Sequence, residues 1–278
     1  MKDIELHKFD HSSFEVNICK TDKFKTINII LLSEFKYNKN LATHIALLGY
    51  IFEQGSVNFP SDNNFQVILE ELYGAKIATN VTRKKDRHVV MINLEFPNGK
   101  YMDQPDLLKK VIKLLRDIFF QPVIYSSEYG EAALEKAKSN LRNKINDIEN
   151  NIFLKANSKA LEYLYNDKKL STPYGDSEEL NQLSLENLKA IHKAMPDISE
   201  NELFFIGDVE KSIILEELEE EFKVEIDFKT VLKNSSEVKA DDIIESHLEI
   251  QEGLGESGVL VLVFKINKGK DVVNTVIN

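Results

Sequence analysis

Cysteine is nearly absent from this chain, with Cys19 the single one among 278 residues. A lone cysteine excludes an internal disulfide framework and any metal cluster held by several thiolates. Cys19 ends a strand-like run over residues 14–19, where a cysteine usually serves as a small buried apolar residue. The cysteine count is consistent with a reducing compartment, and we expect a cytoplasmic protein.

A targeting segment and long apolar runs are missing from the sequence given. Residues 1–6 do not combine a basic stretch with a following apolar stretch, so no secretory signal is predicted. The longest apolar runs, such as residues 259–264, have the length of a strand. Spanning a bilayer takes about 20 apolar residues. We therefore expect no membrane association.

Basic residues are outnumbered, with 35 Lys and Arg against 46 Asp and Glu and a net charge of -11. A nucleic-acid-binding domain normally shows a basic stripe, so we expect no nucleic-acid partner. The sequence is 42% hydrophobic and 29% charged, which is typical of a folded globular chain. Its length allows one large domain or two small ones.

Apolar periodicity predicts strands and helices in mixed order. The strand patterns cover residues 4–9, 14–19, 26–32, 76–82, 88–96, 203–206, 247–250 and 258–266. The helical patterns cover residues 40–52, 63–73, 105–120, 127–149, 151–165, 185–195 and 209–222. Because these elements do not alternate as βαβ units, we predict an α+β fold, a mostly antiparallel sheet with helices packed on one face.

Two of the predicted helices have features that can be checked in a structure. The helix over residues 127–149 is rich in charge, so we expect it to lie on the surface. Ser184 directly precedes the helix over residues 185–195, where its hydroxyl is placed to cap the first turn.

Residues 46–56 read Ala-Leu-Leu-Gly-Tyr-Ile-Phe-Glu-Gln-Gly-Ser. This segment resembles the one that carries the zinc motif His-x-x-Glu-His in the insulinase and mitochondrial-processing-peptidase family. In that motif two histidines on one helix face bind Zn²⁺, and the glutamate is the general base for the metal-bound water. Here the three positions hold Ala46, Gly49 and Tyr50. Alanine and glycine offer no ligand atom, and tyrosine is a poor match for a two-histidine site.

Further segments resemble the family in the same order. They are Leu-Tyr-Gly-Ala at 72–75, Pro-Tyr-Gly at 173–175, Glu-Glu-Leu at 178–180 and Phe-Phe-Ile-Gly-Asp at 204–208. The family's third zinc ligand is a glutamate on a later long helix, which falls near Leu141 or Arg142, and no acid occurs there. The resemblance comes nearest to the bacterial branch in which an inactive homologue accompanies an active one.

The resemblance also implies a domain organisation. It covers residues 5–225, which is one repeat of the family's two-repeat architecture. We predict a peptidase-like α+β domain over residues 1–228 and a linker over the polar, weakly patterned residues 229–257. Residues 258–278 then resemble the start of a second repeat, cut short either in the natural protein or in the piece given.

The remaining histidines suggest no metal site. His7 and His11 are four residues apart, but in strand and turn text this spacing does not align side chains as it does on a helix. His44 lies two residues before Ala46, and a shifted motif would require a second histidine where Leu48 stands.

The resemblance implies a catalytically inactive peptidase homologue rather than an enzyme. Its expected role is a non-catalytic subunit that pairs with an active zinc peptidase, or with itself, and helps to enclose peptide substrate. Zinc is then expected only in the partner. In the family the substrate adds as a strand to a sheet edge, which corresponds here to residues 76–82. The expected contacts are Ile77, Ala78, Thr79 and Asn80.

Two alternatives remain open at this stage. The chain could be an active zinc metallopeptidase with unrecognised ligands. It could also be a stand-alone peptide-binding or scaffold protein.

Overall fold

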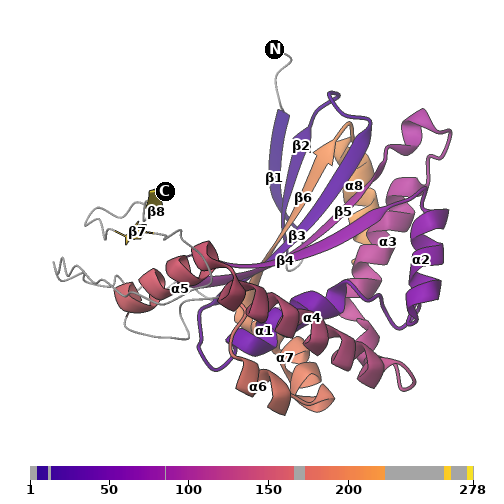
Figure 1. The fold of residues 1–278 in the computed structure, drawn as a ribbon. Helices are drawn as coiled ribbons and strands as arrows, with labels where there is room; N and C mark the ends of the chain where they lie inside the picture. Colours follow the sequence, from indigo (N-terminus) through magenta and orange to yellow (C-terminus); the bar gives the residue numbers. More distant parts are fainter. Residues whose placement is uncertain are drawn as a thin grey trace.

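The computed structural model describes residues 5–11, 14–84, 86–165, 173–222, 260–263 and 274–277. Its centre is a six-stranded sheet with the spatial order β1-β2-β6-β3-β5-β4 (Figure 1). The strands are β1 (Glu5–His11), β2 (Phe14–Lys20), β3 (Thr26–Lys36), β4 (Lys76–Lys84), β5 (Arg87–Pro97) and β6 (Ser199–Gly207). All neighbours are antiparallel except β2 and β6, which are parallel.

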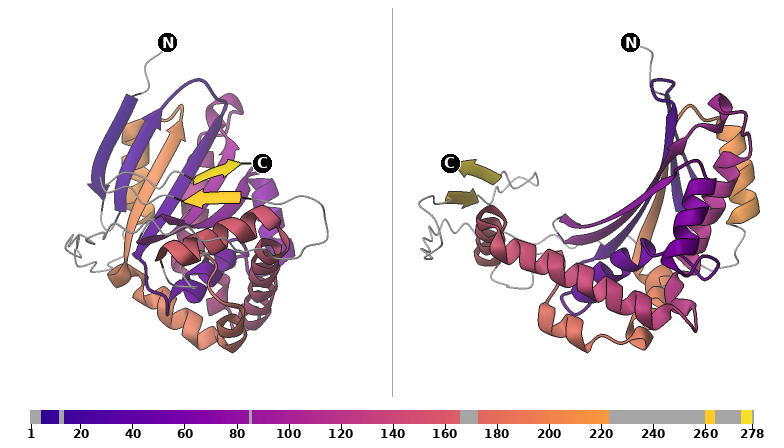
Figure 2. Two further views of the ribbon diagram at one scale, coloured as in Figure 1. Left: turned by 60° about the vertical axis from the view of Figure 1, so that its left-hand side comes forward. Right: turned by 45° about the vertical axis from the view of Figure 1, so that its right-hand side comes forward.

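The helices gather on one side of this sheet. They are α1 (Ala42–Phe52), α2 (Asp62–Glu71), α3 (Leu107–Phe120), α4 (Gly130–Asn150), α5 (Ile152–Tyr165), α6 (Ser177–Gln182), α7 (Leu185–Ile198) and α8 (Lys211–Glu221). The right-hand view of Figure 2 shows α2, α3 and α8 stacked against one face, with α5 projecting away from this layer. The predicted α+β fold with a mostly antiparallel sheet is confirmed.

The alternation of β3 shows how the sequence places the core. Ile27, Ile29, Leu31, Ser33 and Phe35 are buried, while the residues between them are partly exposed. Successive side chains of a strand point to opposite faces, so one face of the sheet is dry and the other is wetter.

Helix α1 is apolar nearly all round, and this explains its place at the centre of the fold. It contacts β4 and β5 on one side and α4, α6 and α7 on others. A helix without a polar face is stable only when it is enclosed.

The expectation that residues 127–149 lie on the surface is wrong for one face of α4, because Leu134, Ala137 and Leu141 are buried.

The C-terminal part is described only in two short strands. β7 (Leu260–Val263) lies inside the strand predicted over residues 258–266 and pairs antiparallel with β8 (Asn274–Ile277). The predicted linker over residues 229–257 and the strand predicted at 247–250 lie outside the described residues. Within the described part, no helix is both long and apolar enough to cross a membrane.

Candidate functional site at α1 and the edge strand β4

Helix α1 carries the three motif positions and buries two of them. Ala46 and Gly49 are buried, and neither has a side-chain atom that could bind a metal ion. A methyl group on the Cα of Gly49 would lie 2.5 Å from Val81 Cγ2 of β4 and 3.6 Å from Val90 Cγ1 of β5. Any side chain at position 49 therefore requires Val81 to move.

Tyr50 stands where the second histidine would be. Its side chain is half-buried, and burial is the main cause that raises the pKa of its hydroxyl to about 12, with smaller contributions from Tyr174, Glu53 and Asp147. The phenol therefore stays protonated at neutral pH. A protonated phenol is a donor group and does not replace a neutral imidazole as a zinc ligand.

The position of the third ligand is also without a carboxylate. Leu141 is fully buried in α4, and Arg142 donates a hydrogen bond from Nη2 to Asn181 Oδ1 at 2.8 Å. In the described ranges of the chain, no group of three or more His, Cys, Asp or Glu residues is arranged to hold a metal ion. The residues at the motif positions do not fit zinc.

Two other segments of the resemblance meet at the N-terminal end of α1. Thr43 Oγ1 donates to Glu179 Oε2 at 2.6 Å and accepts from the backbone N–H of Asp176 at 3.1 Å. Gly175 has φ +74°, and a Cβ there would lie 2.2 Å from Thr43 Oγ1, so the turn requires glycine. His44 lies at the same end, with Nδ1 3.9 Å from Glu179 Oε1. The two segments therefore hold α1 in place.

The expected peptide-binding residues lie on β4, which is the edge strand of the sheet. Ala78 and Asn80 are exposed, and Ile77 and Thr79 are partly exposed. The backbone N–H of Thr79 points away from β5 and donates to Glu53 Oε1 at 2.6 Å. In an antiparallel ladder the outward and inward backbone groups alternate, so Ala78 and Asn80 bond to β5.

Glu53 is the site residue that sequence reasoning missed. It follows the end of α1 and lies three residues after Tyr50, on the same side of the helix. Its partner Thr79 is 26 positions later. The only signal in the sequence was its place three residues after the last motif position, Tyr50. Glu53 links the altered motif to the edge strand.

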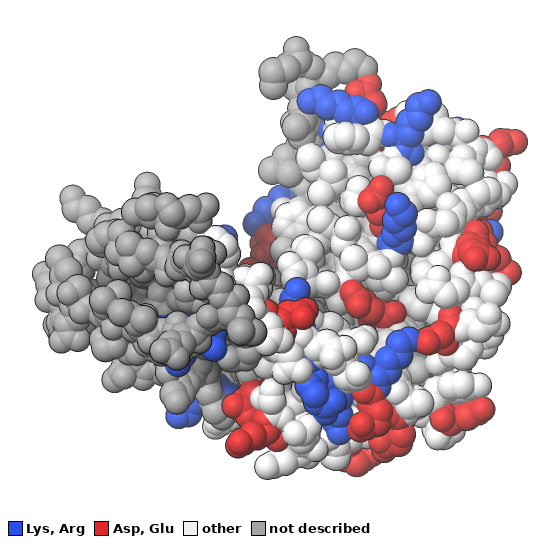
Figure 3. Space-filling model, viewed as in Figure 1, with Lys and Arg blue, Asp and Glu red and all other residues white. Residues whose placement is uncertain are grey.

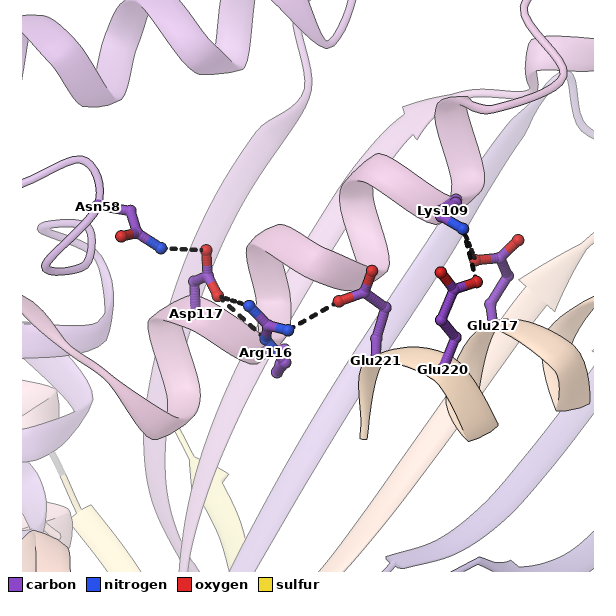
Figure 4. Close-up of polar contacts among 7 residues, drawn as sticks. All are labelled: Asn58, Lys109, Arg116, Asp117, Glu217, Glu220 and Glu221. Carbon is purple, nitrogen blue, oxygen red and sulfur yellow. Dashed lines mark hydrogen bonds and ion pairs between the residues drawn. The ribbon is translucent and has the colours of Figure 1, made fainter. Parts of the chain in front are cut away.

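A second polar cluster lies apart from this site, between α3 and α8 (Figure 4). Arg116 donates from Nε and Nη2 to Asp117 Oδ1, at 3.0 and 2.5 Å, and from Nη1 to Glu221 Oε2 at 2.8 Å. Asn58 Nδ2 donates to Asp117 Oδ2 at 2.7 Å. Each of these groups has a partner, so the cluster joins elements and offers no free group for chemistry. On the face in Figure 3, basic and acidic side chains are interspersed.

The open six-stranded sheet packed against the buried α1 has the fold found in one half of larger solved structures. A solved structure of a conserved protein from Enterococcus faecalis V583 is 20% identical, with a TM-score of 0.72 over 81% of this chain and 52% of that one. The peptidase M16 inactive domain from Pseudomonas fluorescens is 15% identical, with a TM-score of 0.64 over 84% of this chain and 53% of that one. No family model matches the sequence.

A curated relative extends the comparison to the level of sequence. The chain is 25% identical over 251 residues to the probable inactive metalloprotease YmfF of Bacillus subtilis (strain 168). The match covers 88% of this chain and 59% of that protein, so the chain spans less than two thirds of its relative. The predicted resemblance to the inactive branch of the insulinase, or M16, family is confirmed by this relative and by the M16 inactive domain.

Proposed function

We propose that this chain is a non-catalytic M16-type half that pairs with another M16-type domain and helps to hold a peptide. The observation that carries the proposal is the state of α1. The helix keeps its place beside β4, while Ala46, Gly49 and Tyr50 supply no zinc ligand set and Val81 fills the space beside Gly49. The arrangement of α1 beside β4 without a zinc ligand set supports a role in forming the binding surface rather than in hydrolysis.

Pairing is supported by the lengths of the similar proteins. This chain covers 52% and 53% of the two solved structures and 59% of the curated relative. Each similar chain therefore has room for a second domain of comparable size. The experiment is co-purification of the tagged chain from its native host, with identification of the bound proteins. We expect a homologue that carries His-x-x-Glu-His, or a second copy of this chain; recovery of neither would favour a stand-alone scaffold.

Zinc content separates the proposal from the alternative of an active peptidase. We expect purified protein to contain far less than one zinc per chain after dialysis, because the motif positions lack imidazoles. Inductively coupled plasma mass spectrometry measures this. One tightly held zinc per chain would contradict the proposal.

Peptide binding is proposed at the β4 edge, by addition of a strand. The test of peptide binding depends on which residues of β4 bond to β5. A proline at Ala78 or Asn80 would remove a bond of the β4–β5 ladder and so would disturb the sheet itself. The better test changes the peptide: methylation of alternate backbone nitrogens prevents strand pairing and leaves the side chains unchanged. We expect the methylated peptide to lose binding, as measured by fluorescence anisotropy.

A further inference from the structure

The edge of β4 is not free at its centre. Thr79 is the middle residue of the strand predicted over residues 76–82, and its outward N–H donates to Glu53 Oε1 at 2.6 Å. Hydrogen bonds to an ionised acceptor are short and about twice as strong as neutral ones. A backbone carbonyl of an added strand would need the same N–H, since strand addition uses the outward backbone groups of the edge.

Helix formation alone does not explain the hydrogen bond between Glu53 and Thr79, as the position of Glu53 on α1 shows. Glu53 is the C-cap residue of α1, and the C-terminal end of a helix carries partial negative charge. A carboxylate is unfavourable at that end unless a donor compensates it. The Thr79 N–H supplies the donor, from a different element.

The neighbourhood of Glu53 joins this contact to the altered motif. The carboxylate contributes to the raised pKa of Tyr50, which stands at the position of the second histidine. Gly49 on the preceding turn contacts Val81, two residues beyond Thr79 on β4. The last turn of α1 therefore faces the central part of the edge strand.

We infer that Glu53 closes the β4 edge, because its carboxylate occupies at the Thr79 N–H the place that a carbonyl of an added peptide strand would take. A peptide binds there only by displacing Glu53. The inference rests on the proposed function, since it concerns the same edge. It makes Glu53 the residue that sets the affinity of the edge for a strand.

The test uses the full chain and three variants. Glu53→Ala removes the carboxylate, and Glu53→Gln keeps a neutral acceptor on the same side-chain length. Glu71→Ala is the matched control, because it removes the same charge from the end of α2, where Glu71 is exposed. The probe is a short fluorescein-labelled peptide of alternating threonine and valine with lysine at both ends. The same peptide with alternate backbone nitrogens methylated is the second probe.

We expect Glu53→Ala to bind the unmethylated probe about tenfold more tightly than the natural chain, which is the scale of one charge-assisted hydrogen bond. Glu53→Gln should fall between the two, at about threefold. Glu71→Ala should match the natural chain. Amide hydrogen exchange supplies an independent readout, since the Thr79 N–H should exchange faster in Glu53→Ala without probe. If Glu53→Ala does not fold, Glu53→Gln still tests the inference.

The possible failures are distinguishable. Equal affinity of all four proteins for the unmethylated probe, with loss of binding for the methylated one, would overturn the role of Glu53 and leave the β4 edge as the binding site. Equal binding of both probes would overturn strand addition and the role of Glu53 together. Absence of binding in every protein would have the same consequence. Weaker binding by Glu53→Ala would show that the carboxylate supports the peptide instead of excluding it.

Discussion

At the scale of single residues, position 49 is the most constrained part of the altered motif. Glycine is a poor residue for a helix interior, and replacing it with alanine usually stabilises a helix by about 1 kcal/mol. Here the Cβ would approach Val81 Cγ2 to 2.5 Å, inside a closely packed core. The packing of α1 against β4 therefore reverses the usual effect.

We predict that Gly49→Ala lowers the free energy of unfolding by about 1–3 kcal/mol, the usual range for an overfilled core. Urea unfolding monitored by circular dichroism measures the change. The control is the double variant Gly49→Ala with Val81→Ala, in which the added methyl group has room. Val81→Ala should cost less in the Gly49→Ala background than alone, and additive effects would contradict the contact.

A second residue-scale prediction concerns His88, which is fully buried in β5. Its Nε2–H donates to the carbonyl oxygen of Pro173 at 2.7 Å. Burial is the main cause that lowers the pKa of His88 to about 4; the bond to Pro173 raises it and Arg83 lowers it. The unfolded chain, with a histidine pKa of about 6.5, binds a proton at higher pH than the folded chain does. His88 therefore contributes stability above pH 6.5 that is lost as the pH falls toward 4.

We expect the natural chain to lose stability more steeply over this interval than a His88→Gln variant, by up to about 1.4 kcal/mol per pH unit. Urea titrations at several pH values between 7 and 4 give the two slopes. The comparison of slopes is insensitive to a constant loss of stability in the variant. Parallel slopes would show that His88 is accessible to protons in the folded state.

At the scale of elements, the spacing of apolar residues is enough to predict a helix or strand that is long and packed on one side. The strands β2 to β6 and the helices α1 to α4 follow the predicted patterns within a few residues. The cap predicted at Ser184 is confirmed, because its hydroxyl accepts from Asn187 N–H in a capping box. Helix α6 was missed since six residues give too little periodicity; its start is set by Asp176, which accepts from the N–H groups of Glu178 and Glu179.

The site could be predicted from the sequence only in part. The altered motif segment placed Ala46, Gly49 and Tyr50 on one helix, because spacing along a helix is a local property. The bond between Glu53 and Thr79 depends on how α1 and β4 pack, and no local pattern reports this. The same holds for Val81 beside Gly49.

The element-scale prediction concerns the cluster that joins α3 to α8. Replacing Arg116 with leucine leaves the buried carboxylates of Asp117 and Glu221 without their cation. Breaking a buried ion pair costs about 3–5 kcal/mol, and we expect about 2 kcal/mol here because Arg116 is partly exposed to solvent. Thermal unfolding measures the loss. Arg142→Leu is the matched control, because Arg142 is a partly exposed arginine of α4 that bonds to the neutral Asn181; it should change stability by less than about 0.5 kcal/mol.

At the scale of the whole molecule, the start of α5 is the clearest candidate for contact with a second domain. Ile152, Phe153 and Leu154 are consecutive and are 52%, 47% and 44% exposed. In Figure 2, α5 extends away from the sheet and its helix layer. A contiguous exposed apolar group commonly marks a protein–protein interface. The similar solved structures have about twice the matched length, which leaves room for a domain to cover it.

We predict that Phe153→Glu weakens association with the co-purified partner by at least tenfold, because a charge replaces an apolar contact. Surface plasmon resonance measures the affinity. Ile213→Glu is the control, since Ile213 is 47% exposed on α8 at a different place in the fold. Equal loss in both variants would argue against α5 as the contact.

The contact between Gly49 and Val81 also bears on whether a zinc motif could be built into α1. Restoring histidines at positions 46 and 50 would not suffice, because a glutamate at position 49 meets the side chain of β4. An acid near Leu141 would have to enter a fully buried site. The changes at positions 49 and 141 would each disturb closely packed core residues, so each is expected to cost stability. The packing around α1 therefore makes a zinc motif difficult to build at these positions.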